Sequence, residues 1–276
     1  MEGLRDIQIK RSKLMKLAIS NIAWNPQNNT EVFSIMEKYH YLGLEIAPSI
    51  IVGENPYSKC KEAKLFAQKL KEQYGFSICS MQSIWYGKQE EIFADAQQRE
   101  ELKNYTYQAI NFAREIGCPN IVFGCPKNRN LYHEDDYQVA VEFFRELGDV
   151  AYRSDTTLAL EANPIIYGTN FLNKTEEALE IIKEINSPGL KLNLDLGTMI
   201  FNNEDISMFA GQGKWIHHVH ISEPGLKMIE QRKLHEEVKY ILMAEDYEQY
   251  ISIEMGKQDN LDELKNVLRY ITTIFG

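Results

Sequence analysis

The chain of 276 residues has no apolar run near the ~18 residues that a membrane-spanning helix needs. Its first thirteen residues are polar and charged, which differs from the apolar region of a secretory signal. From these two absences we predict a cytoplasmic protein with no membrane partner.

Positive charge is also scarce, because 30 Lys and Arg stand against 40 Asp and Glu and give a formal net charge of −10. Duplex nucleic acid is bound largely through neutralisation of its phosphates by Lys and Arg. The acidic balance therefore predicts that nucleic acid is not a partner.

Two common motifs are missing. No two of the four cysteines form a CxxC pair, so we expect reduced thiols. No GxGxxG follows the first apolar run, which argues against an open doubly wound sheet that binds a dinucleotide.

The sequence does contain eight short apolar runs that alternate with longer helical patterns, and a length close to the ~250 residues of a (β/α)₈ barrel. We predict an α/β protein whose residues 15–276 form a single (β/α)₈ TIM barrel, the catalytic domain. Residues 1–14 are expected to be an extension: an upstream start, a vector remnant or a disordered tail. The predicted strands are Leu14–Asn21, Gly43–Pro48, Ser77–Ser83, Asn120–Cys125, Thr157–Asn163, Leu190–Leu196, Ile216–Ser222 and Ile251–Met255.

Polar residues interrupt the last four runs near their carboxyl ends. Side chains alternate between the helix layer and the interior of a barrel. If leucine and isoleucine mark the helix-facing side, then Glu161, Asp195 and Glu254 point inward. On the seventh strand, His220 and His218 share one face, while His217 shares the other with Val219.

Three inward carboxylates would repel one another, and each costs several kcal/mol if it is buried without a partner. The same alternation predicts that these strands turn no Lys or Arg inward, so a divalent cation is the simplest compensation. One imidazole and three carboxylates suit Mn²⁺ best, with Mg²⁺, Co²⁺ or Zn²⁺ as alternatives. The predicted ligands are Glu161, Asp195, His220 and Glu254.

At these residues the sequence resembles the xylose isomerase-like barrel superfamily, in particular its sugar phosphate isomerase/epimerase branch. The resemblance runs from about Met15 to the C-terminus. It is carried by Gly43-Leu44-Glu45, Leu160-Glu161-Ala162-Asn163-Pro164, Asn193-Leu194-Asp195, His218-Val219-His220-Ile221-Ser222-Glu223 and Ser252-Ile253-Glu254.

The resemblance implies that Glu161 and Glu254 bind metal and also form the acid/base pair on either side of the substrate carbon, while Asp195 and His220 are ligands alone. A metal ion would polarise the carbonyl, and one carboxylate would remove the neighbouring proton. Return of a proton on the opposite face gives epimerisation, and return to the adjacent carbon gives isomerisation. Loss of a β-hydroxyl would instead make the enzyme a keto-polyol (inosose-type) dehydratase.

The sequence departs from the ketose 3-epimerases of this superfamily at two substrate contacts: Thr198 replaces a histidine, and Leu226 replaces an arginine. Endonuclease IV-type enzymes need further histidines on the third and fourth strands, where this chain has Gln82 and Cys125. A metallo-endonuclease or phosphoesterase, or a barrel without catalysis, is therefore the less favoured hypothesis.

The predicted substrate contacts are strand ends and loop residues, each with an alternative role. Aromatic rings would stack on a sugar or pack at the rim; Arg129 would hold an anion or lie in a solvated loop. Glu45 would bind a hydroxyl, orient a neighbour or serve the structure, and Asn163 would support Glu161 or the substrate. Lys227 and His235 would reach the mouth or lie in an exposed loop and helix start. The full set is Trp24, Glu45, Gln82, Trp85, Arg129, Asn163, His218, Lys227 and His235.

The resulting hypothesis is a metal-dependent isomerase or epimerase whose partner is a small carbohydrate. The resemblance also implies a homodimer or homotetramer.

Overall fold

The computed structural model describes residues 14–276, in which eight parallel strands close into a barrel in the order β1 to β8. All eight strands fall within or overlap the predicted runs, which confirms the single (β/α)₈ barrel. Of the predicted extension, residues 1–13 lie outside the described part of the chain. The strands are β1 (Lys16–Ser20), β2 (Gly43–Ile46), β3 (Ser77–Met81), β4 (Asn120–Phe123), β5 (Thr157–Glu161), β6 (Leu190–Asp195), β7 (Ile216–Ile221) and β8 (Tyr250–Ile253).

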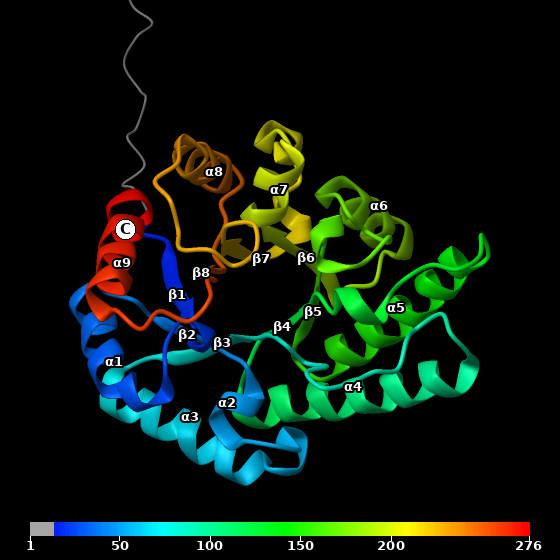
Figure 1. Cartoon of the computed structure of the whole chain (residues 1–276), viewed down its shortest axis with the longest axis horizontal. Helices are drawn as coiled ribbons and strands as arrows, with labels where there is room; N and C mark the ends of the chain where they lie inside the picture. The colour runs from blue at the N-terminus through cyan, green and yellow to red at the C-terminus, as the bar shows by residue number, and fades with distance from the viewer. Residues whose placement is uncertain (1–13) are drawn as a thin grey trace, which may run out of the picture.

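Helices surround the strands (Figure 1), and α9 lies beside α1 where the barrel closes through pairing of β1 with β8. None of the helices within residues 14–276 is both long and apolar enough to cross a membrane. The helices are α1 (Asn29–Lys38), α2 (Pro48–Val52), α3 (Cys60–Tyr74), α4 (Ala96–Ile116), α5 (Asp136–Arg153), α6 (Thr175–Ile185), α7 (Leu196–Asn202), α8 (Lys233–Ala244) and α9 (Leu261–Phe275).

The core lies between the strands and the helix layer. In β5, Leu158 and Leu160 are fully buried, as expected for residues that face the helices. In α5, Phe144, Leu147 and Ala151 are fully buried at spacings of three and four residues, the pattern of a helix that packs one face against a sheet.

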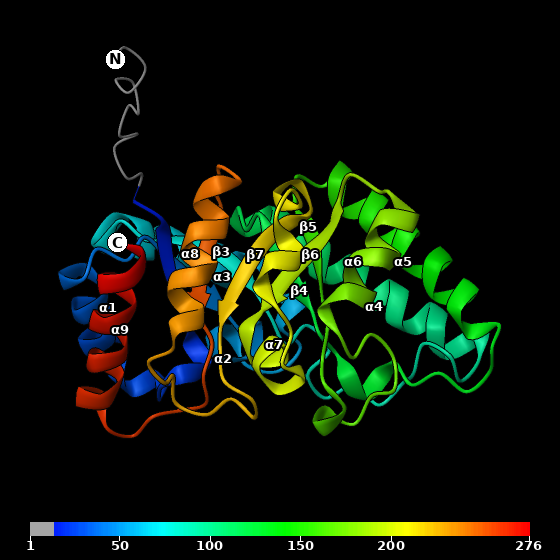
Figure 2. The same cartoon turned by 90° about the horizontal axis from the view of Figure 1, so that it is seen from above.

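The parallel register brings the carboxyl ends of the strands to one rim of the barrel (Figure 2). Glu161 is paired with Asn193, Asp195 with His220, and His220 with Ser252. Catalytic groups of such barrels lie at this rim, because only there do loops and strand ends from all units meet.

One irregularity changes the predicted alternation. The register between β6 and β7 shifts between Leu192 and Asn193, so His217 is an extra residue in β7. Its ring contacts Asn120 of β4 and Thr157 of β5, at Nδ1–Oδ1 2.8 Å and Nε2–Oγ1 3.4 Å. The prediction that His217 shares the side of Val219, away from His218, was wrong because it assumed an unbroken strand.

Candidate metal centre and active site

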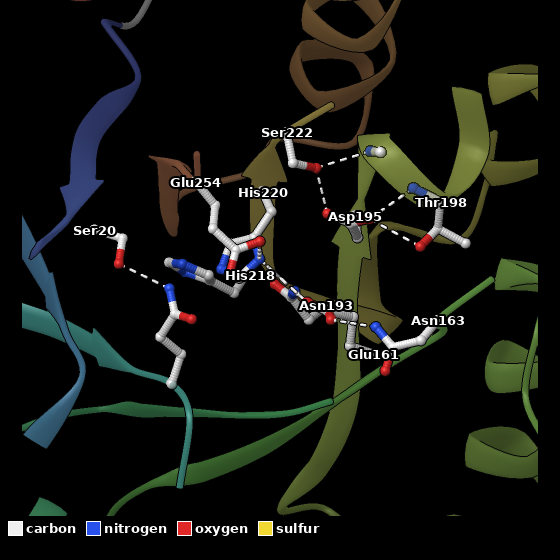
Figure 3. A network of polar contacts seen from close by, with 12 residues as sticks. Ser20, Glu161, Asn163, Asn193, Asp195, Thr198, His218, His220, Ser222 and Glu254 are labelled. Carbon is white, nitrogen blue, oxygen red and sulfur yellow. Dashed lines mark hydrogen bonds and ion pairs between the residues drawn. The ribbon is translucent and has the colours of Figure 1, made fainter. Parts of the chain in front are cut away.

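Four side chains from β5, β6, β7 and the residue after β8 meet at the rim. Glu161, Asp195, His220 and Glu254 each offer a ligand atom, and these atoms lie within 4.8 Å of one another. His220 Nδ1 lies 3.1 Å from Glu161 Oε2 and 3.2 Å from Glu254 Oε2. Figure 3 shows these side chains pointing toward a common space from neighbouring strands.

Asp195 ends β6 and caps the start of α7, so its carboxylate is fixed from several directions. Oδ2 accepts from the backbone N–H of Thr198 at 2.6 Å and from the Thr198 hydroxyl at 2.8 Å, while Oδ1 accepts from the hydroxyl of Ser222 (Figure 3). Burial, together with Glu161 and Glu254, raises the pKa of Asp195 to about 7. The carboxylate is therefore held in place but is costly to charge without a cation.

The Thr198 hydroxyl also lies 2.8 Å from the carbonyl of Ala162, so its single proton is shared between that oxygen and Asp195 Oδ2. Thr198 is fully buried and does not line the cavity described below, so it anchors Asp195 and does not reach a substrate.

We expect Thr198→Val to lower the free energy of unfolding by about 1–3 kcal/mol, because the Ala162 carbonyl and Asp195 Oδ2 lose a buried donor. Urea denaturation measures the change. Thr273→Val is the matched control, since its hydroxyl makes one exposed helix bond and the variant should change stability by no more than about 0.5 kcal/mol. Equal losses in the two variants would contradict the anchoring role.

Two amides hold Glu161. Asn163 Nδ2 donates to Oε1 at 2.7 Å and Asn193 Nδ2 donates to Oε2 at 2.6 Å. Burial alone would raise the pKa of Glu161, but the His220 imidazolium and these amides outweigh burial and lower it. Gly124 leaves the space for this carboxylate, since a Cβ there would lie 3.0 Å from Oε1.

Glu254 is held less firmly. Its carboxylate contacts His220, with Oε2 3.2 Å from Nδ1, and burial raises the pKa of the carboxyl despite that contact. Burial would lower the pKa of His220, but Glu45, Glu254 and Glu161 raise it well above its usual value. The two glutamates thus face the same space with opposite shifts of pKa.

Arg129 is not where the sequence suggested. Its guanidinium is fully buried, and Nη2 donates at 2.9 Å to the Glu161 carbonyl and at 2.9 Å to Asn163 Oδ1. Because the side chain turns away from the cavity, it cannot make the predicted bidentate contact with a substrate anion. It places a cation behind Glu161 that the strand alternation did not predict, and it fixes the orientation of the Asn163 amide.

Glu45 and His218 also lie deeper than predicted. Both are buried below His220, and Glu45 Oε2 lies 3.1 Å from His220 Nε2 and 2.9 Å from His218 Nε2. Neither residue lines the cavity, so the predicted substrate contacts of Glu45 and His218 are replaced by contacts with a candidate ligand.

A cavity of about 530 Å³ opens above the four candidate ligands, at the ends of β3 to β8. Of the predicted substrate contacts, Gln82, Trp85 and Asn163 line it, together with Glu161, Asp195 and Glu254. The remaining wall includes Tyr86, Lys127, Tyr167, Ser222, Glu223 and Leu226.

Three further predicted contacts lie away from this cavity. Trp24 is buried in the core, where its Nε1 donates to Asn29 Oδ1 at 2.8 Å and its ring meets the edge of Phe33. His235 is buried against the hydroxyl of Tyr270 in α9, and Lys227 is exposed. Packing into the core decided the positions of Trp24 and His235, and residue type alone did not reveal it.

Sequence reasoning missed the supporting roles of Asn193, Ser222 and Tyr167. Asn193 lies two residues before Asp195 in β6 and so shares its inward face. This two-residue spacing is the sequence signal that could have indicated its role. Tyr167 accepts from the backbone N–H of Gly225 at 2.9 Å and so ties the loop after β5 to the loop after β7. Nothing in the sequence indicated that contact.

The donor set fits a divalent cation. Three buried carboxylates converge with one imidazole nitrogen, and burial together with the neighbouring Glu161 and Glu254 raises the pKa of Asp195, so the charged set favours a cation. Three oxygen donors and one nitrogen donor are typical of Mn²⁺ and Mg²⁺ sites and also of some Zn²⁺ sites. Within residues 14–276 a second possible group, Glu45, His218 and His220, shares His220 with the first.

A model of the xylose isomerase-like TIM barrel family matches residues 39–273. The chain belongs to this family. A search of curated proteins found no match.

Solved structures of xylose isomerase-like barrels have the same fold. A 3-keto-D-glucoside 4-epimerase of E. coli superposes with a TM-score of 0.76 at 19% identity, over 94% of this chain and 99% of that one. A D-psicose 3-epimerase of Clostridium cellulolyticum superposes with a TM-score of 0.76 at 16% identity, over 95% of this chain and 99% of that one. An AP endonuclease of family 2 from Brucella melitensis superposes with a TM-score of 0.74 at 16% identity, over 95% of this chain and 100% of that one. At these identities the likeness establishes the fold.

Proposed function

We propose that this xylose isomerase-like barrel is a divalent-metal-dependent isomerase or epimerase of a sugar, a sugar phosphate or a related keto-polyol. The observation that carries the proposal is the pair Glu161 and Glu254, which project from β5 and from the end of β8 into one cavity, with His220 between them. Structural neighbours with the same fold include sugar epimerases, which supports the reaction class.

The two glutamates can act as base and acid. Glu161 is suited to remove a proton next to a carbonyl, because two amides hold both of its oxygens in place. Glu254 enters the same cavity from the end of β8, where it is placed to exchange a proton with the substrate carbon from another side. Return to the same carbon on the other face inverts it, and return to the neighbouring carbon moves the carbonyl.

Glu161, Asp195, His220 and Glu254 would hold the metal ion, which we propose to be Mn²⁺. When bound, the ion supplies a positive charge that polarises the substrate carbonyl. Ser222 and Thr198 would keep Asp195 aimed at it.

Substrate recognition must differ from that of the ketose 3-epimerases that the sequence resembles. Thr198 is turned into the barrel wall, and Leu226 presents an aliphatic side chain to the cavity. We propose that Gln82, Trp85 and Asn163 contribute polar and aromatic contacts instead. The cavity of about 530 Å³ has room for a ligand larger than a single small sugar, since sites of about 300–1,000 Å³ bind drug-sized molecules.

Deuterium exchange tests the function. Metal-reconstituted protein is incubated in D₂O with ketoses, sugar phosphates, 3-keto-glucosides and inositol ketones, and carbon-bound deuterium is measured by NMR and mass. We expect uptake next to the carbonyl of one class, and the product then separates epimerase, isomerase and dehydratase. If Mn²⁺, Mg²⁺, Co²⁺ and Zn²⁺ all fail to bind, the proposal is wrong.

The location in the cytoplasm, the absence of a nucleic-acid partner and the homodimer or homotetramer stay predictions. Light scattering of the purified protein would determine the number of subunits.

A further inference from the structure

We infer that Glu45 is a positioning residue that selects the metal-binding nitrogen of His220, and that Gln82 links this pair to the cavity. The inference rests on the proposed metal centre but concerns residues outside the predicted ligand set. It is carried by the contacts beneath His220, which no reaction step described above uses.

Glu45 sits on β2, across the barrel from β7, and is fully buried. Its Oε2 lies 3.1 Å from His220 Nε2 in hydrogen-bond geometry. A carboxylate can only accept, so Nε2 must carry the proton. Nδ1, which faces Glu161 and Glu254, is then the nitrogen at which a cation would replace the second proton of the imidazolium.

His218 does not compete for this role. Its Nε2 lies 2.9 Å from the same Glu45 oxygen but makes no hydrogen bond there, and its ring meets that of His220 edge to face. The hydrogen bond of Glu45 Oε2 is therefore made with His220, and the His218 ring packs beside the His220 ring.

The other oxygen of Glu45 is held by Gln82. Gln82 Nε2 donates to Glu45 Oε1 at 3.1 Å and to Ser20 Oγ at 2.7 Å. Gln82 also lines the cavity, so one amide connects a substrate-facing wall with the partner of a metal ligand. Partners of this kind fix ring orientation, and their loss usually costs about 10–100-fold in metal affinity.

Mn²⁺ affinity of chelator-treated protein tests the role. We expect Glu45→Met, which keeps length but removes the acceptor, to weaken Mn²⁺ binding about 10–100-fold. Glu45→Gln should lose less, because an amide oxygen still accepts. Asn120→Ala is the matched control, since Asn120 is buried in the same barrel and contacts Ser80 and His217 but none of the four ligands. It should melt at a lower temperature with unchanged affinity.

The ring nitrogens of His220 give a readout that needs no variant. In ¹⁵N-histidine-labelled wild-type protein loaded with diamagnetic Zn²⁺, we expect Nε2 to keep its proton and Nδ1 to carry none. A proton on Nδ1, or wild-type affinity in folded Glu45→Met, would overturn the role of Glu45. An equal loss of affinity in Asn120→Ala would overturn it too, since general loosening would then explain the effect. If wild-type protein binds neither Mn²⁺ nor Zn²⁺, both the proposed function and the role of Glu45 are contradicted.

Discussion

Glu161→Gln and Glu254→Gln are each expected to lower deuterium incorporation by about 10²–10⁴-fold at saturating Mn²⁺, because each removes a group that takes or returns a proton. The measurement is the initial rate of exchange into the substrate identified by the panel, with metal content checked in every sample. Glu31→Gln, an exposed change on α1, is the control and should leave the rate unchanged.

The two variants should differ in stability without metal. Glu161 accepts from two amides, and the Asn163 amide is held by Arg129, so a glutamine there disturbs an ordered set of contacts. Glu254 is held by His220, and its neutralisation also relieves repulsion from Glu161. We therefore expect metal-free Glu254→Gln to be more stable toward urea than Glu161→Gln. Full exchange activity in either variant would contradict its role as acid or base.

Alternation along the strands was enough to predict where Glu161, Asp195 and Glu254 point. Each follows a regular apolar strand, and the two-residue period fixes the face of every side chain. The same rule failed at His217, because a bulge adds a residue and no sequence signal marked it. The expectation that no Lys or Arg shares the inward side of these strands was wrong for Lys191, which by parity lies on the same side of β6 as Asp195. Lys191 is at the opposite end of the strand, where its ammonium stacks on Trp215.

Loop residues were harder to predict, because their positions depend on what packs around them. Arg129 was interpreted as a surface cation, yet the loop after β4 turns its guanidinium into the space behind Glu161. Trp24 is predicted to stack on a sugar or to pack at the rim, yet its indole completes the core between β1 and α1. Residue type indicates what a side chain can contact, whereas tertiary packing decides whether it faces the cavity.

The affinity for Mn²⁺ should rise steeply with pH. Below about pH 7, metal-free Asp195 holds a proton, and the raised pKa of His220 means that its ring is also protonated there. A metal ion binds deprotonated ligands, so binding must release both protons. The association constant is then expected to rise with pH, by up to about 100-fold per unit below pH 7, where two protons are released, and less steeply once Asp195 has lost its proton.

Calorimetric titration between pH 6 and 8, in two buffers of different ionisation enthalpy, counts the protons directly. Asp195→Asn should bind Mn²⁺ more weakly and should lose one released proton below pH 7. Asp205→Asn is the matched control, since Asp205 caps a short exposed turn through Ser207 and lies outside the ligand set. An affinity that does not change with pH would show that Asp195 and His220 are not the residues that bind the metal, because a ligand with these shifted pKa values must exchange its proton for the ion.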